Sequence, residues 1–595
     1  MSVAQHASMA SDGAGVSLDA IGPTRLQTLL WRWGGERLVW ALLAVAVFVI
    51  AIVPLLYTVN AALYGETRTG LSNVRDLTAI LDVYTGTEYL GYLANALILA
   101  VVVTVLSLAA GVAMAVLMAR ADLPFKNTFD LLIIMPLFLS PFTGLIAWIT
   151  LGSQKTGFVN VAISAVLRTV GIDPGPIINI WSYAGVIWVM FLFFCPFAYL
   201  FTVGSLRAMD SSLEESARTS GATPLQTLMR ITIPMALPSI LASGLLIFIL
   251  AAEMYTLPGI IGTSVGFTTL PWQIYQDSTV FPVHRAHAAA AGTMLLWVTV
   301  LGVWLQRRIT RRSERFVTVS GKGFRGRPLS LGRARWIALA GLGFYVLSAD
   351  ILPFGALILS SFMKYSAPMI TADIFTLDHY RQILTLQDMR LALWNTTWLA
   401  VLSGGICVLV GLLISFMEVR RPGPATRTLA FLGVLPVAVP GLVYGIGLLW
   451  TYIQTPIYGT PWILLMAYVA KFLPYGIVVS RSAVIQLHPE LEQSARMSGA
   501  TGLMAMRKIT MPLLKPTLIA ILFFVMLMSI KELSASILLY NQKSQVLSVL
   551  TWHYMDAGDY QFAAAIGVVQ TVMMIALVIF TRAIFRVQME KALSK

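Results

Sequence analysis

Two short polar segments interrupt this apolar sequence, and they carry acidic, hydroxyl and basic side chains at the same spacing. The first begins with Glu214 and Glu215, and the second, shifted by 278 residues, begins with Glu492. Neither holds a nucleophile beside a base, a set of metal ligands or a phosphate-binding glycine loop. These segments therefore favour binding of another protein, not catalysis. The candidate binding residues are Glu214, Glu215, Ser216, Ala217, Gly221, Ala222, Thr223, Glu492, Gln493, Ser494, Ala495, Gly499, Ala500 and Thr501.

Two further carboxylates, Glu253 and Glu532, lie inside apolar stretches, where an ionised group is costly and often functional. Glu253 is expected roughly 24 Å along its helix at 1.5 Å per residue, and Glu532 at a comparable depth, toward the outer side of a membrane. One interpretation is that both face a transport path for a cationic or chelated metal. The other is that each lies at the membrane surface or pairs with a neighbour, as Lys531 could pair with Glu532.

The composition places the chain in a membrane. Of 595 residues, 57% are hydrophobic and only 11% are charged, and the mean hydropathy is +0.79. Soluble domains carry about 25% charged residues. Stretches long enough to cross a bilayer, roughly 20 residues, predict an all-α integral membrane protein with about twelve transmembrane helices in two sets of six. The expected spans are 38–62, 92–119, 129–151, 180–206, 236–258 and 287–306, then 336–361, 392–417, 428–452, 462–482, 513–538 and 563–586.

The net charge of +14 is densest in a linker and does not indicate a nucleic-acid partner. The stretch from Gln306 to Arg335 holds ten Lys or Arg residues against one Glu. Because basic loops stay on the cytoplasmic side, this linker, both polar segments and both termini are expected in the cytoplasm. The expected organisation is a cytoplasmic tail (1–35), a first half (36–306), the basic linker (307–335) and a second half (336–595).

The two sets of spans are copies of one another. The second spans begin at Asn95 and Asn395, and the third spans share Pro136 and Pro436, at a shift of 300 residues. The shift is 278 at the polar segments, so the halves differ by insertions or deletions in the outer loop between. Two copies with an even number of spans predict a parallel repeat around a central path. The prolines are expected to kink their spans, for packing or to shape a gate.

Each polar segment is expected to form a helix–turn–helix elbow. The stretch from Leu213 to Ser220 favours a helix, and Gly221 can adopt the positive φ that ends it. A second short helix is expected to start near Pro224, because proline suits the first helical turn, and to run toward Arg230. Gly499 has the same place in the second copy. A rigid elbow of this kind can be gripped and moved by another protein.

The elbows resemble the EAA loop of the permeases of bacterial ABC importers, whose pattern is Glu-Ala-Ala, three residues, Gly, nine residues, then Ile-x-x-Pro or Leu-Pro. In that family the loop forms a coupling helix that docks in a groove of the ATPase subunit. The resemblance implies docking surfaces at 216–225 and 494–503. Gln493 departs from the Glu of the pattern, and Glu492 beside it is the candidate substitute. The matching residues are Glu215, Ser216, Ala217, Gly221, Ile231 and Pro234, then Ser494, Ala495, Gly499, Ile509 and Pro512.

The resemblance covers both halves and is closest to the fused double permeases of ferric-iron importers, especially from Lys531 onward. It implies a non-catalytic permease of the bacterial inner membrane without a cofactor of its own. The implied partners are two copies of a separate ATPase, which binds ATP and Mg, and a periplasmic substrate-binding protein. Thiamine, polyamine and aminoalkylphosphonate importers share this architecture and remain alternatives. The outer residues His553, Asp556 and Asp559 are expected to contact the binding protein or solvent, and a metal site is not expected there.

Two other classes fit less well. An ion-driven secondary transporter can also have two sets of six spans, but it would transport alone and would carry more charge within its spans. A membrane-embedded enzyme would need catalytic residues gathered at one depth. The chain has no G-x-x-x-x-G-K-[ST] sequence, so hydrolysis of ATP by this chain is not expected.

Overall fold

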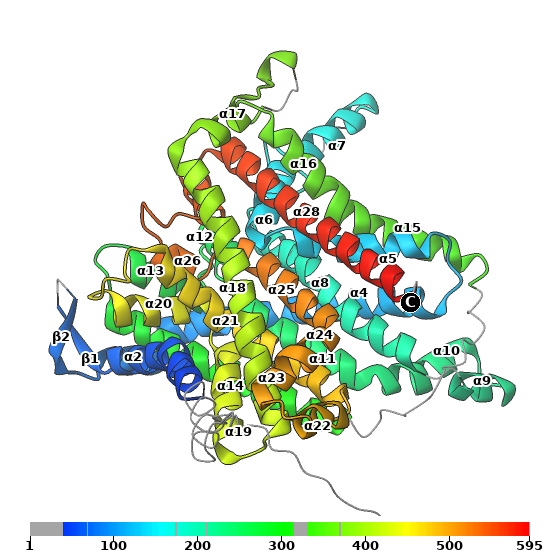
Figure 1. Ribbon diagram of the computed structural model, residues 1–595. Helices are drawn as coiled ribbons and strands as arrows, with labels where there is room; N and C mark the ends of the chain where they lie inside the picture. The colour runs from blue at the N-terminus through cyan, green and yellow to red at the C-terminus, as the bar shows by residue number, and fades with distance from the viewer. Residues whose placement is uncertain are drawn as a thin grey trace, which may run out of the picture.

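The computed structural model describes residues 40–67, 70–172, 175–209, 212–313, 331–367 and 371–593. The expected tail over 1–35 and the middle of the basic linker lie outside the described residues. The fold is helical apart from one antiparallel hairpin of β1 and β2 (Figure 1).

The first half begins with a helix from Trp40, and its last helix continues seven residues beyond the expected end at 306. Its elements are η1 (Phe48–Ile52), α2 (Val53–Ala61), β1 (Tyr64–Thr67), β2 (Gly70–Arg75), α3 (Thr78–Thr85), α4 (Thr87–Arg120), α5 (Lys126–Ile134), η2 (Met135–Phe138), α6 (Pro141–Gly152), α7 (Phe158–Thr169), α8 (Tyr183–Ala208), α9 (Ser212–Thr219), α10 (Pro224–Thr227), η3 (Leu228–Thr232), α11 (Ile233–Ala252), α12 (Thr256–Thr263), α13 (Leu270–Thr279) and α14 (Arg285–Ser313).

The second half repeats this order with η6 in place of the β1–β2 hairpin and without a counterpart of α7. Its elements are α15 (Ala334–Val346), η5 (Leu347–Ile351), α16 (Leu352–Ser361), η6 (Ala372–Ile374), α17 (Asp378–Thr385), α18 (Gln387–Arg420), α19 (Pro424–Val434), η7 (Leu435–Ala438), α20 (Gly441–Tyr452), α21 (Pro461–Gln486), α22 (Glu490–Met497), α23 (Gly502–Ala505), η8 (Met506–Thr510), α24 (Met511–Leu513), α25 (Lys515–Ile530), α26 (Ser536–Leu539), α27 (Leu547–Asp556) and α28 (Tyr560–Leu593).

Nine helices in the described ranges are long and apolar enough to cross a membrane, or twelve if three sharply bent pairs each count as one span. Two of these pairs are the expected third spans. The α5–η2 segment meets α6 at 100°, and α19–η7 meets α20 at 112°. Pro136 and Pro436 lie in the 3₁₀ turns η2 and η7 at these bends. The prolines therefore break the third spans, where the sequence suggested a single kinked helix.

The expected fifth spans are also too long. The first ends at Ala252 and the second at Ile530, six and eight residues before the expected ends at 258 and 538. The second is bent by 72° between α24 and α25. In both halves the helix ends within an apolar stretch, so composition alone does not mark where these helices end.

The same packing recurs in both halves. Helix α4 lies along α8, as α18 lies along α21, and each pair packs on the fifth span of its half. Gly111 of α4 is in close contact with Ala198 of α8, and Gly411 of α18 with Gly476 of α21, which is the position equivalent to Ala198. Asn95 and Asn395 each donate a hydrogen bond to a carbonyl of an outer loop, at 2.8 and 2.9 Å. The expected duplication is thus a duplication of contacts.

The first helix of each half packs against the other half. Helix α2 lies on α20, and α16 lies on α6. The π-helical turn η1 frees backbone carbonyls, and Tyr444 and Tyr452 of the second half donate to those of Ile50 and Val49. The two halves are therefore exchanged at their first helices, and each of the two large hydrophobic clusters contains residues of both halves.

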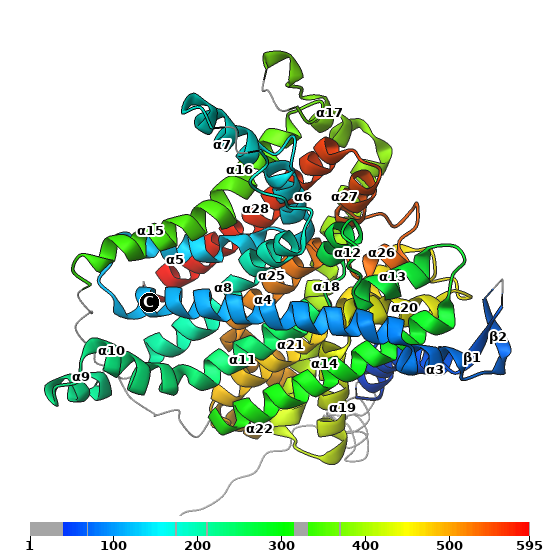
Figure 2. The same ribbon diagram turned by 180° about the vertical axis from the view of Figure 1, so that it is seen from behind.

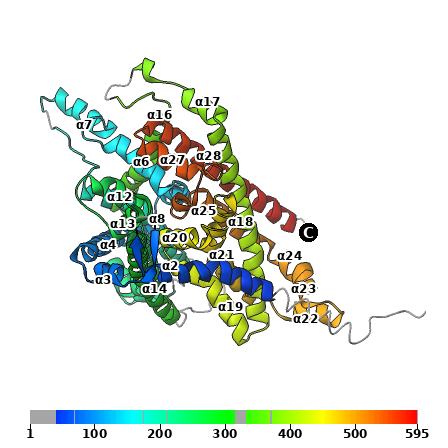
Figure 3. The same ribbon diagram turned by 90° about the vertical axis from the view of Figure 1, so that its left-hand side faces the viewer.

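Both elbows lie at the same end of the molecule. Elements α9–α10 and α22–α23 lie opposite the hairpin, α7 and α17 in Figures 1 and 2. In Figure 3 the helix α28 ends on the side where α22–α24 project, at the mark of the C-terminus. The repeated segments are thus presented together, as a parallel repeat requires.

Candidate functional site

The elbows have the predicted helix–turn–helix form. Helix α9 ends at Thr219, Gly221 has a φ of +87°, and α10 starts at Pro224. A capping box closes the start of α10: the amide of Gln226 donates to Thr223 Oγ1, and the amide of Thr223 donates to Gln226 Oε1. In the second elbow Gly499 has a φ of +89°. The predicted turns at both glycines are confirmed.

Each elbow is fixed to the membrane-spanning part by one buried carboxylate. Arg120, at the end of α4, donates its Nε to Glu214 Oε1 at 2.9 Å, and Thr232 Oγ1 donates to the same oxygen at 2.9 Å. Only 5% of the Glu214 surface is exposed. Charge and hydrogen bonds both point inward, so Glu214 holds the elbow in place and is not part of its surface.

The second elbow has the same anchor. Arg420, at the end of α18, donates its Nε to Glu492 Oε2 at 2.9 Å, and Thr510 Oγ1 donates to Oε1 at 2.9 Å. Arg420 Nη2 also donates to the carbonyl of Leu487. Glu492, with 4% exposed, therefore corresponds to Glu214 and cannot replace the missing surface carboxylate at Gln493. The sequence-based placement of Glu214 and Glu492 among the docking residues does not fit their burial.

The remaining predicted docking residues lie at or near the surface. Those exposed in both elbows are the serines, glycines and threonines, whereas the alanines and Glu215 are half-buried. Exposed apolar side chains accompany them, including Leu213, Leu225 (67% exposed) and Leu491. Apolar groups on a water-facing protrusion are typical of a protein-binding surface. The exposed set is Ser216, Gly221, Thr223, Gln493, Ser494, Gly499 and Thr501, and the half-buried set is Glu215, Ala217, Ala222, Ala495 and Ala500.

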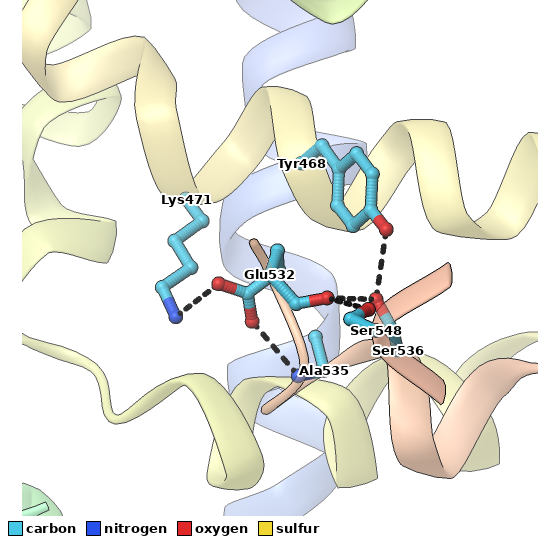
Figure 4. A network of polar contacts seen from close by, with 6 residues as sticks. All are labelled: Tyr468, Lys471, Glu532, Ala535, Ser536 and Ser548. Atoms are coloured by element: carbon cyan, nitrogen blue, oxygen red, sulfur yellow. Dashed lines mark hydrogen bonds and ion pairs between the residues drawn. The ribbon is translucent and has the colours of Figure 1, made fainter. Parts of the chain in front are cut away.

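The second candidate region is a charged cluster between the two halves, where the fifth spans end. We call Glu253, Lys471, Lys531 and Glu532 the central charged cluster. Glu532 is buried and pairs with Lys471 Nζ of α21 at 2.8 Å (Figure 4). Its Oε1 accepts the amide of Ala535, and its carbonyl accepts the hydroxyl of Ser548. Glu532 therefore has a fixed position.

In the described part of the chain the ion pair of Glu532 is made with Lys471, not with Lys531, the partner suggested by the sequence. The Lys531 Nζ instead donates to the carbonyl of Leu137 in the first half at 3.1 Å and lies 5.7 Å from the ring centre of Phe193. Consecutive residues at a helix end point in different directions. Here Glu532 contacts its own half, and Lys531 contacts the first half.

The repeat explains this crossing. At the shift of 278 residues, Lys531 is equivalent to Glu253, and Lys471 is equivalent to Phe193. Glu253 ends α11 and is half-buried, and it lies close enough to Lys471 for their charges to attract. Lys531 of the second half therefore contacts Phe193 of the first, and Glu253 and Lys471 occupy the equivalent positions in the opposite halves. Lys471, the ion-pair partner of Glu532, is a residue that sequence reasoning missed.

An aromatic cluster lies next to these charges and also joins the halves. Trp552 of α27 contacts Phe142, Tyr255, Trp272 and Tyr275 of the first half, with ring centres 5.3 to 6.2 Å apart. The hydroxyl of Tyr255 and the indole nitrogen of Trp272 are buried without a hydrogen-bond partner in the described part of the chain. Buried polar groups of folded proteins are usually hydrogen-bonded, so these two unpartnered groups are unusual.

Asp350 is a further carboxylate that sequence reasoning missed. It lies in the π-helical turn η5 of a membrane span, is 3% exposed, and neither carboxylate oxygen has a partner among the described residues. The equivalent turn η1 carries Ala51 at this position. The turn itself therefore does not require an acidic residue. A lone Asp in an apolar stretch could have been singled out by the same rule that selected Glu253.

The predicted outer residues remain at the surface. His553 and Asp556 lie on α27 and are exposed, and Asp559 Oδ1 accepts the amide of Phe562 at the start of α28. In the described ranges no three His, Cys, Asp or Glu side chains are placed to hold a metal ion.

Two equivalent helical halves, an elbow on each and a charged cluster between them together define a membrane transport protein. The family described as "Binding-protein-dependent transport system inner membrane component" matches residues 107–315 and 407–592, more than half of the chain. The chain belongs to this family. It is a multi-pass permease of the inner membrane, the non-catalytic membrane component of a binding-protein-dependent ABC importer.

Several curated permeases are similar to this chain. Ferric transport system permease protein FbpB of Actinobacillus pleuropneumoniae is 28% identical over 408 residues, which are 67% of this chain and 58% of that protein. Putative ferric transport system permease protein FbpB 1 of Haemophilus influenzae is 26% identical over 480 residues, 79% of this chain and 73% of that protein. Putative 2-aminoethylphosphonate transport system permease protein PhnV of Salmonella typhimurium is 26% identical over 245 residues, 40% of this chain and 89% of that protein.

Proposed function

We propose that the chain is the transmembrane permease of a ferric-iron importer, in which the two fused halves replace two subunits. The relatives named as ferric transport permeases support iron, because one of them aligns over 79% of this chain, across both halves. The aminoethylphosphonate permease aligns over 40%. An aminoalkylphosphonate therefore remains the second candidate substrate, and thiamine and polyamines are further alternatives.

The two elbows would each receive one copy of a separate ATPase, which binds ATP and Mg. Their identical anchors support this role: Arg120–Glu214 and Arg420–Glu492 join each elbow to the long helices α4 and α18. A push on an exposed elbow is thereby passed to a transmembrane helix through a buried ion pair. The elbow end, with both termini, would face the cytoplasm, and the opposite end would receive a periplasmic binding protein.

The transport path would run between the halves through the central charged cluster. Lys531 contacts the first half, and Lys471 lies between Glu532 of its own half and Glu253 of the other. Separation of the halves would break the contacts across the interface and expose Glu253 and Glu532 to the substrate. In the present conformation, these contacts and the aromatic cluster close the path.

Reconstitution tests the function. Proteoliposomes containing the chain, its ATPase and an iron-loaded binding protein should take up radiolabelled ferric iron only with ATP, and Glu492→Gln should reduce that uptake. Uptake by the chain alone would instead identify an ion-driven secondary transporter. ATP hydrolysis stimulated by an aminoethylphosphonate-loaded binding protein, and not by the ferric form, would replace iron by the second candidate.

The hypothesis on Glu253 is tested in the same assay, since Glu253→Ala should lower uptake and leave ATPase binding intact.

A further inference from the structure

Helix α7 is an addition to the first half. The segment between α6 and α8 covers 153–182, whereas the segment between α20 and α21 covers only 453–460. This difference accounts for the change in the repeat shift from 300 to 278 residues. The second half keeps the other elements of the repeat without such a helix.

Helix α7 forms one wall of an apolar groove at the surface. The groove has a volume of about 390 Å³ and lies between α7, the end of α6 and the first span of the second half. Val161 and Ala165 of α7 face Leu352 and Gly355 of α16 across it. Because α16 is part of a candidate membrane span, the groove opens toward lipid. Exposed apolar residues flank it, among them Val166, Ile351 and Ile358.

A polar pocket continues the groove. It has a volume of about 220 Å³, and Phe158 lines both cavities. Hydroxyl groups of Thr150, Ser153 and Ser366 line this second pocket. Trp181 and Tyr560 also line it, and these two residue types mark the headgroup level of membrane proteins. The two cavities together form one site with an apolar and a hydroxyl-rich end.

Two groups at the polar end lack a partner within the described ranges. Ser360 is 1% exposed, lines the pocket, and its hydroxyl makes no hydrogen bond. A buried hydroxyl without a partner is unusual in a folded protein. Lys155 lies in the short loop between Ser153 and Thr156, both of which line the pocket, and is exposed to solvent. Thr150 and Ser153 donate their hydroxyls to carbonyls of their own helix, so the polar end offers one free hydroxyl donor, Ser360, and an exposed lysine in the adjoining loop.

We propose that this site binds one membrane phospholipid, with an acyl chain in the apolar groove and the glycerol ester and phosphate in the hydroxyl-lined pocket. A transmembrane helix of a partner protein would fill the groove but would leave the Ser360 hydroxyl without a partner. A phospholipid matches both ends, because its ester oxygens can accept a hydrogen bond from the Ser360 hydroxyl. Because the walls come from both halves, the bound lipid joins α6 and α7 to α16.

Native mass spectrometry of the full-length protein, extracted in mild detergent and washed, tests the proposal. We expect about one phospholipid per chain to remain bound. Gly355→Leu places a side chain in the groove and should lower the amount of retained lipid about tenfold or more. The reason is that each acyl-chain methylene displaced from the groove loses the free energy of its burial. Gly343→Leu in α15 is the matched control, because a Cβ there also meets no atom within 4 Å and it lines neither cavity; it should retain lipid.

Two further variants keep the test decisive. Ala162→Leu fills the groove from α7 and should repeat the loss if Gly355→Leu does not fold. Lys155→Gln should reduce the preference for phosphatidylglycerol over phosphatidylethanolamine about fivefold, because one lysine near anionic lipid contributes about that factor. Equal retention in the wild type and all groove variants would overturn the proposal, as would lipid lost in the first wash or a partner helix found in the groove.

Discussion

Replacement of Glu492 by glutamine tests whether one buried carboxylate holds the second elbow. The variant keeps the shape of the side chain and an oxygen for the Thr510 hydroxyl, but it removes the negative charge opposite Arg420. The Arg420 side chain is 11% exposed, and its other polar contact within the described residues is the Leu487 carbonyl. The variant therefore leaves a buried guanidinium without its counter-charge.

The magnitude follows from this burial. Removal of one partner of a buried ion pair costs about 3–5 kcal/mol, and the retained hydrogen bond places Glu492→Gln near the lower end. About 3 kcal/mol corresponds to roughly a hundredfold change in an equilibrium, because each 1.4 kcal/mol is a factor of ten. Helix α22 has eight residues and is not stable alone. Local opening of the elbow should therefore become about a hundredfold more frequent.

Hydrogen exchange by mass spectrometry on the purified full-length protein measures this opening. The α22 amides of Glu492→Gln should exchange about a hundredfold faster, with α9 unchanged, and Glu214→Gln should give the opposite pattern. Glu490→Gln is the control on the same helix, because Glu490 is 79% exposed and should contribute little. If Glu492→Gln and Glu490→Gln exchange alike, the carboxylate does not anchor the elbow.

Three other substitutions give further tests. Gly499→Ala should destabilise its turn by about 1 kcal/mol, because a non-glycine residue is strained at a φ of +89°; faster exchange confined to the turn would show this, and normal exchange would contradict it. Asp350→Ala should raise the melting temperature in detergent, since it removes a buried carboxylate without partners and restores the residue type of Ala51; a lower value would mean that Asp350 has a ligand. Lys471→Met should lower the melting temperature by leaving Glu532 unpaired, and adding Glu532→Gln should recover most of the loss; additive losses would argue against coupling.

The sequence predicted those features whose signals are local. The elbow turns follow from Gly221 and Gly499, whose residue type permits the required φ, and the number of spans follows from apolar length. The bends at Pro136 and Pro436 are sharper than the expected kinks because the helix is interrupted on both sides of each bend. In the first half Pro141 starts the next helix, and in the second half Pro440 and Gly441 do so.

Contacts between distant segments were not predictable in the same way. Lys531 is adjacent to Glu532 in sequence, yet the ion-pair partner of Glu532 is Lys471. Helix α21 packs beside α25 and brings Lys471 close to Glu532. The burial of Glu214 and Glu492 depends on Arg120 and Arg420, which are 94 and 72 residues away. Such partners are set by packing between helices, and a single sequence carries little information about them.

The exchanged first helices determine the order in which this protein can mature. Helix α6 is synthesised roughly two hundred residues before α16, the helix that covers it. The surface of α6 that packs against α16 is therefore uncovered in the newly inserted first half. It contacts lipid or a chaperone until the second half is inserted. In a chain truncated after the linker this surface would stay uncovered. The contacts of α2 with α20 and of α6 with α16 can form only after the second half has been synthesised.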